Sequence, residues 1–215
     1  YTGTPAMQAS ILGALERNAL QAADLDWVEL YSCFPCISKM ARRILGWPLD
    51  RWPSVYGGLT FGGGPVANCM THAAAAMVDK LRVSGRHGLI FANGGFATHA
   101  HSIILSRQAP QQPLHPQDFS VQAEADRLRG PVPPLDADYV GPGRIEAISV
   151  PFGRDGAPSF GTVVARSPAG SRFVARVAKA DMVGLERLLS GRTEPVGSSG
   201  EAVAAADGYR YWNAT

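Results

Sequence analysis

The sequence predicts an α/β domain followed by a small antiparallel, barrel-like β domain. Helix and strand patterns alternate over residues 1–107, which is typical of a sheet flanked by helices. Residues 136–215 instead carry short strand patterns separated by turn sequences. The stretch between them, 108–135, is rich in proline, glutamine and charged residues, so we expect a linker there, with a short helix near 122–128.

The first 50 residues predict two helices and one strand. Thr4 followed by Pro5 is typical of an N-cap and a first helical position, which predicts a helix over about 5–18. The run at 27–31 favours a strand. A second helix is expected beyond it, because an apolar stripe ends at Gly46. The members of this stripe are Ile37, Met40, Ala41, Ile44 and Leu45.

A glycine-rich loop, a third helix and a hairpin complete the α/β domain. Five glycines occur at 57–65, and an apolar stripe beyond Pro65 predicts a helix that ends at Gly85. Strand patterns at 88–92 and 98–106 enclose an Asn-Gly-Gly sequence, which strongly favours a turn. We therefore expect these two strands to pair as a hairpin. The stripe of the third helix comprises Val66, Met70, Ala73, Met77, Val78 and Leu81.

The carboxyl-terminal domain predicts three strands, one helix and a polar tail. Strand patterns lie at 144–150, 161–166 and 171–177, and the last two are expected to pair across a Ser-Pro-Ala-Gly turn. Asp181 is expected to cap the helix, which carries leucines at helical spacing. We expect the remaining residues to form a polar tail that closes with Tyr209-Arg210-Tyr211-Trp212.

Composition argues against several classes of protein. Lysine and arginine number 20 against 18 acidic residues, and no stretch concentrates the basic ones, so nucleic acid is not an expected partner. Apolar runs are far shorter than the roughly 20 residues that a membrane helix needs, so no membrane association is expected. The start of the chain shows no secretory signal, and three cysteines do not suggest a disulfide scaffold. We therefore expect a cytoplasmic location.

Three motifs occur in order over residues 3–107. The first is Asp24-Leu25-Asp26-Trp27-Val28-Glu29-Leu30, which leads into Tyr31-Ser32-Cys33-Phe34. The second is the glycine-rich loop Gly57–Pro65, and the third is Phe91-Ala92-Asn93-Gly94-Gly95. Their order and spacing resemble the thiolase superfamily, more narrowly the acetyl-CoA acetyltransferase-like proteins that have an added carboxyl-terminal domain.

The resemblance implies a fold, a substrate class and partners. It implies the carboxyl-terminal part of the layered thiolase fold, without the half that carries the nucleophilic cysteine, followed by the family's added β domain. The implied substrate is coenzyme A, an acyl-CoA or a related thioester, with no tightly bound cofactor. Because a sheet that packs against another half would leave an apolar face uncovered, we expect the missing amino-terminal half or a second subunit as a partner, and a homo-oligomer.

The resemblance also indicates which catalytic groups differ. Thiolases use a histidine and a second cysteine beside the nucleophile, and an oxyanion hole built partly from an Asn or His of the first motif. This sequence has Tyr31 in the first motif, Gly64 at the histidine position and Phe91 or Asn93 at the second cysteine position. The family's proton-transfer groups are therefore largely missing, and the chain alone is expected to be an incomplete acyltransferase.

The candidate catalytic residues are Tyr31, His72, Asn93 and His99. The phenol of Tyr31 could donate to a substrate carbonyl, and His72 shares a helix face with Asn68, four residues earlier. His99 and His101 lie on the same side of a predicted strand, where they could form a donor cluster with Asn93 or hold a metal that would need further ligands. Structural or surface roles stay open for all of them, and we expect no metal site.

The candidate residues for binding coenzyme A are small or amide side chains. Glycines let a thin ligand approach the backbone, and the glycine-rich loop lies near the acyl group and pantetheine arm in the resembled family. The loop lacks the Lys-Ser or Lys-Thr ending of a nucleotide-binding P-loop. The candidates are Gly62, Gly63, Gly64, Asn68 and Gly94.

Two other functions stay open. The substitutions at Tyr31 and Gly64 also suit a non-catalytic module that binds coenzyme A or an acyl group. In addition, Cys33-Phe34-Pro35-Cys36 is a Cys-x-Pro-Cys sequence between a predicted strand and helix, where a helix N-terminus would stabilise an attacking thiolate. The sequence therefore also permits a redox function, whereas a two-cysteine zinc site lacks a second pair.

Overall fold

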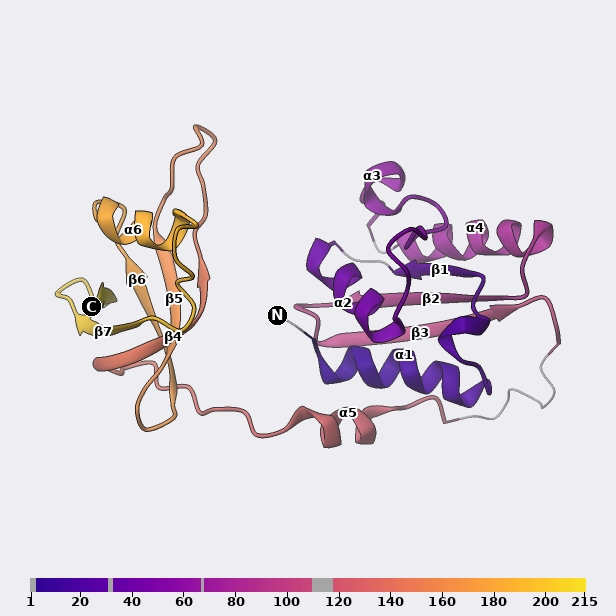
Figure 1. Ribbon diagram of the computed structural model, residues 1–215, viewed down its shortest axis with the longest axis horizontal. Coiled ribbons are helices and arrows are strands. Elements are labelled where there is room, and N and C mark those ends of the chain that lie inside the picture. Colours follow the sequence, from indigo (N-terminus) through magenta and orange to yellow (C-terminus); the bar gives the residue numbers. More distant parts are fainter. Residues whose placement is uncertain (1–2, 31–32, 67, 110–117) are drawn as a thin grey trace. The chain divides into compact units, whose positions relative to one another are not determined.

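The computed structural model describes every residue except 1–2, 31–32, 67 and 110–117. The described residues form two compact units, Tyr1–Gly130 and Pro131–Thr215, each with its own core (Figure 1). Both the α/β part and the separate β domain expected from the sequence are present. Residues 118–129, which were expected within the linker, belong to the first unit.

The first unit is a three-stranded sheet with helices on both faces. Strand β1 runs parallel to β2, and β3 returns antiparallel to β2, in the order β1-β2-β3. Leu89 and Phe91 face a core shared with α1 and α2, whereas Ile90 faces Met77 and Leu81 of α4 on the other side. The elements are α1 (Pro5–Arg17), η1 (Ala22–Asp24), β1 (Trp27–Leu30), α2 (Pro35–Leu45), α3 (Gly58–Gly62), α4 (Cys69–Val83), β2 (His87–Gly94), β3 (His99–Ser106) and α5 (Gln122–Arg129).

Local signals determine the ends of the first two helices. The Thr4 hydroxyl oxygen accepts a hydrogen bond from the Met7 amide at 3.2 Å, and Pro5 occupies the first helical position. Helix α2 ends at Gly46, whose φ of +62° is the left-handed conformation that glycine adopts readily. The helix predictions for this part are therefore confirmed.

The glycine-rich segment departs from the expected loop. It contains the short helix α3, which ends at the C-cap residue Gly63 with a φ of +67°, and α4 begins only at Cys69. Val66, expected on the buried stripe, is 92% exposed. The later stripe residues Ala73 and Met77 are buried, as expected.

Helix α5 packs against α1. Arg17 donates from Nη1 to the Phe119 carbonyl at 2.8 Å and from Nη2 to the Ser120 carbonyl at 2.9 Å. A Cβ at Gly13 of α1 would come within 2.9 Å of Val121 Cγ1, so the two segments approach closely. These contacts explain why the chain before α5 joins the first unit.

The second unit is a closed five-stranded barrel with one helix. Its strand order is β4-β5-β6-β8-β7, with a parallel β6–β8 pair and α6 between β6 and β7. This connectivity is that of an OB-fold barrel. The elements are β4 (Gly141–Ser149), β5 (Gly161–Arg166), β6 (Arg172–Val177), α6 (Met182–Leu189), β7 (Ser199–Ala204) and β8 (Arg210–Ala214).

The prediction of a polar tail is wrong, because the tail contains β7 and β8. Trp212 of β8 is only 3% exposed and belongs to the barrel core. Its ring lies over Gly200 of β7, where an added Cβ would come within 2.4 Å of Trp212 Cζ2. The inward residues of β7 are Gly200 and Ala202, which are too small to give the sequence an apolar strand pattern.

Candidate functional site

The candidate residues gather around one end of the sheet. Strands β1 and β2 are parallel and therefore end at the same edge. Helix α4 leads back to the start of β2, so its first turn lies at that carboxyl edge, where Figure 1 also shows α3 and the start of α2. The predicted position Tyr31 follows β1 directly but lies outside the described residues.

Asn93 has the least satisfied side chain at this edge. It lies in β2 on the face of Phe91, and both its amide nitrogen and its carbonyl oxygen are buried without a hydrogen-bond partner among the described residues. A buried amide that lacks partners costs about 1 to 3 kcal/mol. Such a group is therefore suited to contact a ligand that supplies the missing hydrogen bonds.

Aromatic side chains connect the start of α2 to the hairpin turn that follows Asn93. The rings of Phe34, the N-cap residue of α2, and Phe96 stack with centroids 6.4 Å apart. Phe61 of α3 and Val66 are exposed on neighbouring elements, as is Phe96 itself. Large apolar side chains are therefore exposed on several elements around this edge.

Asn68 and His72 form the pair expected from their spacing. Asn68 Nδ2 lies 3.2 Å from His72 Nε2, and both residues are exposed at the start of α4. The hydrogen bond orients the imidazole toward the solvent-facing side of the first turn. This positions two polar groups at the edge without burying them.

The structural requirement for glycine differs among the three candidate positions of the loop. A Cβ at Gly62 would come within 2.4 Å of Tyr56 Cε2, and Gly63 has a positive φ. Gly64 has neither a positive φ nor a neighbour within 4 Å of an added Cβ. Backbone conformation and packing therefore explain two of these glycines but not Gly64, which leaves open space beside the chain.

A buried carboxylate that the sequence analysis missed holds the start of this segment. Oε2 of Glu29 in β1 accepts hydrogen bonds from Ser54 Oγ at 2.7 Å and from the Val55 amide at 3.0 Å. Ser54 Oγ in turn accepts from the Gly57 amide at 2.8 Å. Burial raises the pKa of Glu29, although the hydrogen bond from Ser54 opposes this shift. An acidic residue inside the apolar run at 27–31 was the signal that could have revealed it.

His99 lies apart from Asn93. The register pairs Asn93 with Ala100 and Gly94 with His99, so His99 and His101 occupy the opposite face of the sheet from Asn93. The register therefore separates Asn93 from the two histidines, with which it could have formed a donor cluster. His99 is exposed, and its Nδ1 lies 3.1 Å from Thr98 Oγ1.

His99 lines a cavity of about 540 Å³ with α1 and the segment before α5. The other walls include Ser10, Arg17 and Ser120. Neither this cavity nor another cavity of the first unit, lined by Trp27 and Trp47, is lined by the glycine-rich segment or Asn93. That these two segments line one cleft stays a prediction.

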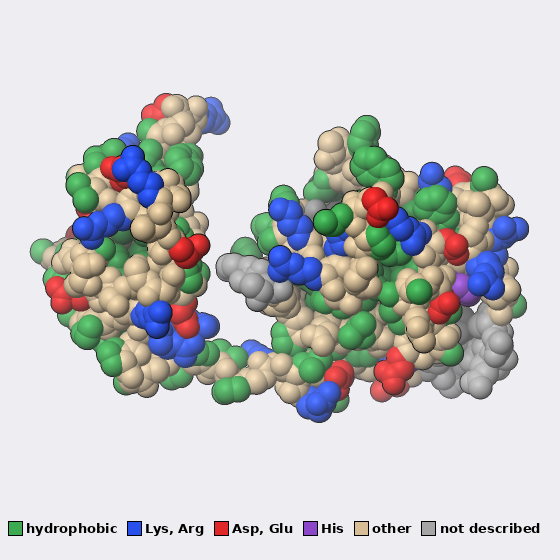
Figure 2. All heavy atoms as spheres, in the orientation of Figure 1, with side chains coloured by type: hydrophobic (Ala, Val, Ile, Leu, Met, Phe, Trp, Pro, Cys, Tyr) green, Lys and Arg blue, Asp and Glu red, His purple; other side chains and the backbone are tan. Residues whose placement is uncertain are grey.

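Several other features bear on the predicted functions. Within the described ranges, no helix is long and apolar enough to cross a membrane, and no three His, Cys, Asp or Glu side chains cluster as metal ligands would. All three cysteines are free, with Cys33 and Cys36 exposed and Cys69 buried. On the face shown in Figure 2, positive and negative side chains are interspersed, so this face presents no extended basic surface.

Comparisons with known proteins agree with the two-unit architecture. Residues 120–207 match the family described as the thiolase-like protein type 1 additional C-terminal domain. Among solved structures, the chain matches a monomeric SCP2-thiolase like protein type 1 from Mycobacterium smegmatis with a TM-score of 0.81 and 26% identity. The match covers 99% of this chain and 46% of that protein, so the chain spans about half its length. No curated protein matches.

These findings confirm the resemblance drawn from the three motifs. The family match covers α5 and the barrel as far as β7, whereas the structural match extends through the α/β unit that carries the motifs. The expectation of a homo-oligomer stays a prediction, and the matched structure is described as monomeric. Residues 120–207 thus carry the additional carboxyl-terminal domain of thiolase-like protein type 1, and the fold of the chain is that of the carboxyl-terminal part of such a protein.

Proposed function

We propose that the first unit supplies part of the binding site for coenzyme A, an acyl-CoA or a related thioester in a thiolase-like acyltransferase. The observation that carries this proposal is the unpartnered, buried amide of Asn93 at the carboxyl edge of the sheet. A thioester carbonyl would accept from its Nδ2, and a ligand N–H would donate to its Oδ1. The proposed ligand is a substrate, not a tightly bound cofactor.

Other residues at the edge have proposed roles. Gly64 and its neighbours Gly62 and Gly63 would let the thin pantetheine arm pass close to the backbone, because Gly64 has open space beside it. Asn68 and His72 would hydrogen-bond the ligand from the start of α4, where they are exposed. Tyr31, Gly94 and His99 stay candidates from the sequence.

We propose that this chain binds the thioester but does not complete the reaction alone. Gly64 stands where the family has a histidine, and neither Phe91 nor Asn93 can act as the second cysteine. The exposed apolar side chains around the edge, including Phe61 and Phe96, would pack against the remaining half of a longer thiolase-like protein or against a second subunit. A cytoplasmic location is part of the same proposal.

Calorimetric titration with acetoacetyl-CoA tests the role of Asn93. We expect saturable binding that Asn93→Ala weakens about tenfold, which corresponds to about 1.4 kcal/mol, because a neutral hydrogen bond is lost. Asn213→Ala is the matched control, since Asn213 is exposed on β8 in the other unit, and it should leave the affinity unchanged. Equal affinities for both variants would remove Asn93 from the site.

Together with an assay of thiolysis in the presence of free coenzyme A, this titration separates the acyltransferase from the non-catalytic binding module. Thiolysis of acetoacetyl-CoA by this chain, well above the uncatalysed rate, would contradict binding without turnover. If neither coenzyme A nor acetoacetyl-CoA binds to the chain at millimolar concentration, the proposed ligand class is rejected.

A redox function is a second candidate. Cys33 and Cys36 are both exposed and free, and α2 begins at Pro35 between them, so Cys36 lies in its first turn. The chain would then reduce insulin disulfides with a dithiol as the reductant, and Cys33→Ser should abolish this activity. Cys69→Ser is the control, because its thiol is buried. Insulin reduction no faster than that by the dithiol alone would reject this candidate.

A further inference from the structure

Three arginines lie in one row across the outside of the barrel. The strand register pairs Arg144 of β4 with Arg166 of β5, and Arg166 with Arg172 of β6. Like charges placed directly opposite one another in a sheet are destabilising. Such a row therefore needs negative charge from elsewhere.

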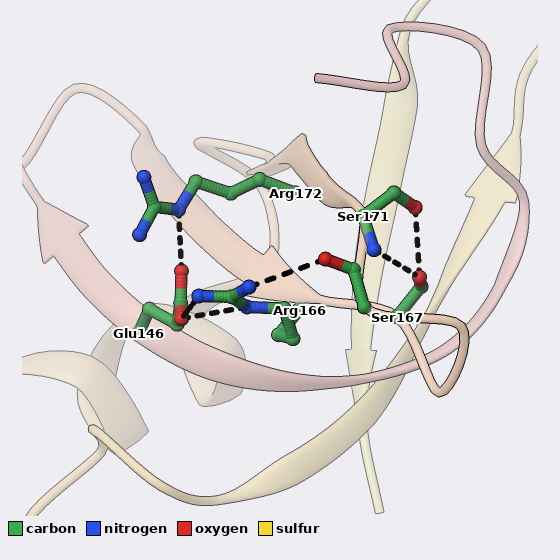
Figure 3. A network of polar contacts seen from close by, with 6 residues as sticks. Glu146, Arg166, Ser167, Ser171 and Arg172 are labelled. Carbon is green, nitrogen blue, oxygen red and sulfur yellow. Dashed lines mark hydrogen bonds and ion pairs between the residues drawn. The ribbon is translucent and has the colours of Figure 1, made fainter. Parts of the chain in front are cut away.

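One carboxylate partly neutralises this row, as Figure 3 shows. Oε1 of Glu146 accepts from Arg166 Nε at 2.8 Å and Nη2 at 2.6 Å, and Oε2 accepts from Arg172 Nε at 2.5 Å. Burial opposes ionisation of Glu146, but the hydrogen bonds from Arg172 and Arg166 hold its pKa below the usual range. One negative charge shared between two guanidinium groups leaves one positive charge uncompensated.

Arg144 adds a second uncompensated charge. Its Nε donates to the Gly197 carbonyl at 2.7 Å, and no ion pair involves it within the described part of the chain. The side chains of Arg144 and Arg166 line a cavity of about 590 Å³ in the barrel unit. The Glu146 carboxylate also lines this cavity, and further lining residues are Pro142, Pro168, Ser199 and Thr215.

A structural role explains only part of the arrangement. Arg166 Nη1 donates to the Gly170 carbonyl at 3.2 Å, and Ser167 Oγ accepts from the Ser171 amide at 3.1 Å. These bonds close the turn between β5 and β6, so they give Arg166 and its partner Glu146 a structural role. They do not involve Arg144, which lines the cavity and whose own bond to the Gly197 carbonyl uses only Nε.

We propose that this cavity binds the phosphate group of a small phosphorylated molecule, a phosphate monoester or a diphosphate. Guanidinium groups recognise phosphate oxygens through paired, charge-assisted hydrogen bonds. Arg144, which forms no ion pair among the described residues, and Arg166, which shares the Glu146 carboxylate with Arg172, give the cavity positive charge that suits a phosphate, and Pro142 and Pro168 offer apolar contacts to the rest of the ligand. The site lies in the barrel and is independent of thioester binding by the first unit.

An NMR titration of the full chain with inorganic pyrophosphate tests the site. At constant ionic strength, we expect saturable shifts of the Ser199 and Gly200 amides, which line the cavity. Arg144→Gln should weaken binding about tenfold or more, because a charge-assisted hydrogen bond is lost. Arg154→Gln is the matched control. Arg154 is exposed in a turn outside the cavity, so this variant should bind pyrophosphate with the affinity of the wild type.

A second variant keeps the test decisive if Arg144→Gln folds poorly. Glu146→Gln removes the competing carboxylate, so pyrophosphate should bind more tightly to this variant than to the wild type. Equal shifts with sodium chloride at the same ionic strength, or equal affinity of the wild type and Arg144→Gln, would overturn the proposal.

Adenosine 3′,5′-bisphosphate distinguishes a free phosphate from an organic one. Tighter binding of this nucleotide than of pyrophosphate, read from the Ser199 and Gly200 amides, would support a phosphorylated organic ligand whose remainder fills the cavity. Binding of pyrophosphate alone would support a site for a small inorganic diphosphate. Binding of neither compound would overturn the assignment of the site.

Discussion

Replacing Glu29 by alanine is expected to lower the free energy of unfolding of the first unit by about 3 kcal/mol. The carboxylate is 1% exposed, and it is the acceptor for the Ser54 hydroxyl and the Val55 amide. Alanine would leave both donors without this acceptor and would open a cavity behind β1. Urea unfolding followed by circular dichroism measures the loss.

Glutamine at position 29 is the matched control. Its carbonyl oxygen can replace Oε2 as the acceptor for Ser54 and Val55, so the loss should be small compared with that of alanine. A loss of about 3 kcal/mol in both variants would show that the negative charge, and not the hydrogen-bond acceptor, stabilises the segment.

The stabilities of the wild type and of Glu29→Gln should also depend differently on pH. Burial raises the pKa of Glu29 in the folded state above its ordinary value of about 4.3, so folding favours the protonated form. The contribution of Glu29 to stability is therefore complete below that value and is lost as the pH rises through the folded-state pKa. Relative to the wild type, Glu29→Gln should therefore gain stability as the pH rises through the folded-state pKa of Glu29.

Replacing Trp212 by alanine is expected to destabilise the barrel by about 3 to 5 kcal/mol. The ring is 3% exposed and lies near Phe173, with the ring centroids 6.3 Å apart. Because the two units have separate cores, we expect two unfolding transitions in scanning calorimetry, with the loss in one of them and the other unchanged.

Two variants control for the loss of an aromatic side chain. Trp52→Ala removes a ring that is 85% exposed and should change stability by less than about 0.5 kcal/mol. Trp212→Phe keeps an aromatic ring and removes an indole N–H that is buried without a partner among the described residues, so its loss should be well below that of alanine. A barrel transition that is the same in Trp212→Ala and in the wild type would contradict the buried position of this ring.

The sequence predicts those elements whose ends depend on adjacent residues. Thr4 caps α1, Gly46 ends α2, and Asp181 caps α6 by accepting from the Gly184 amide at 2.8 Å. Each signal acts within one helical turn, so it can be recognised without knowledge of the rest of the fold. The hairpin between β2 and β3 is predictable for the same reason.

The barrel's last strands could not be predicted because their stability depends on distant residues. Strand β7 pairs with β4, about 60 residues earlier in the chain, and its inward side is formed by Gly200 and Ala202. Small residues there make room for Trp212, and this close packing leaves no apolar alternation in the sequence. Strand β7 can therefore be recognised only from its contacts in the closed barrel.

The candidate site was predictable only in part. The spacing of Asn68 and His72 on one helix suffices to predict their hydrogen bond. The separation of Asn93 from His99 depends on the hairpin register, since a shift of one residue moves a side chain to the other face. The row of arginines in the barrel likewise exists only through the register of three strands, so the sequence alone gave no reason to connect Arg144 with Arg172.

The position of α5 affects how this protein can be divided. By sequence family the added domain starts at residue 120, whereas by packing the boundary falls after Gly130. Helix α5 thus belongs to the added domain by sequence match, whereas it packs on α1 of the first unit. A chimaera that receives the barrel from a relative should keep the resident α5 and join the donor sequence after Gly130, because a junction at residue 120 would place a foreign helix against Gly13 and Arg17.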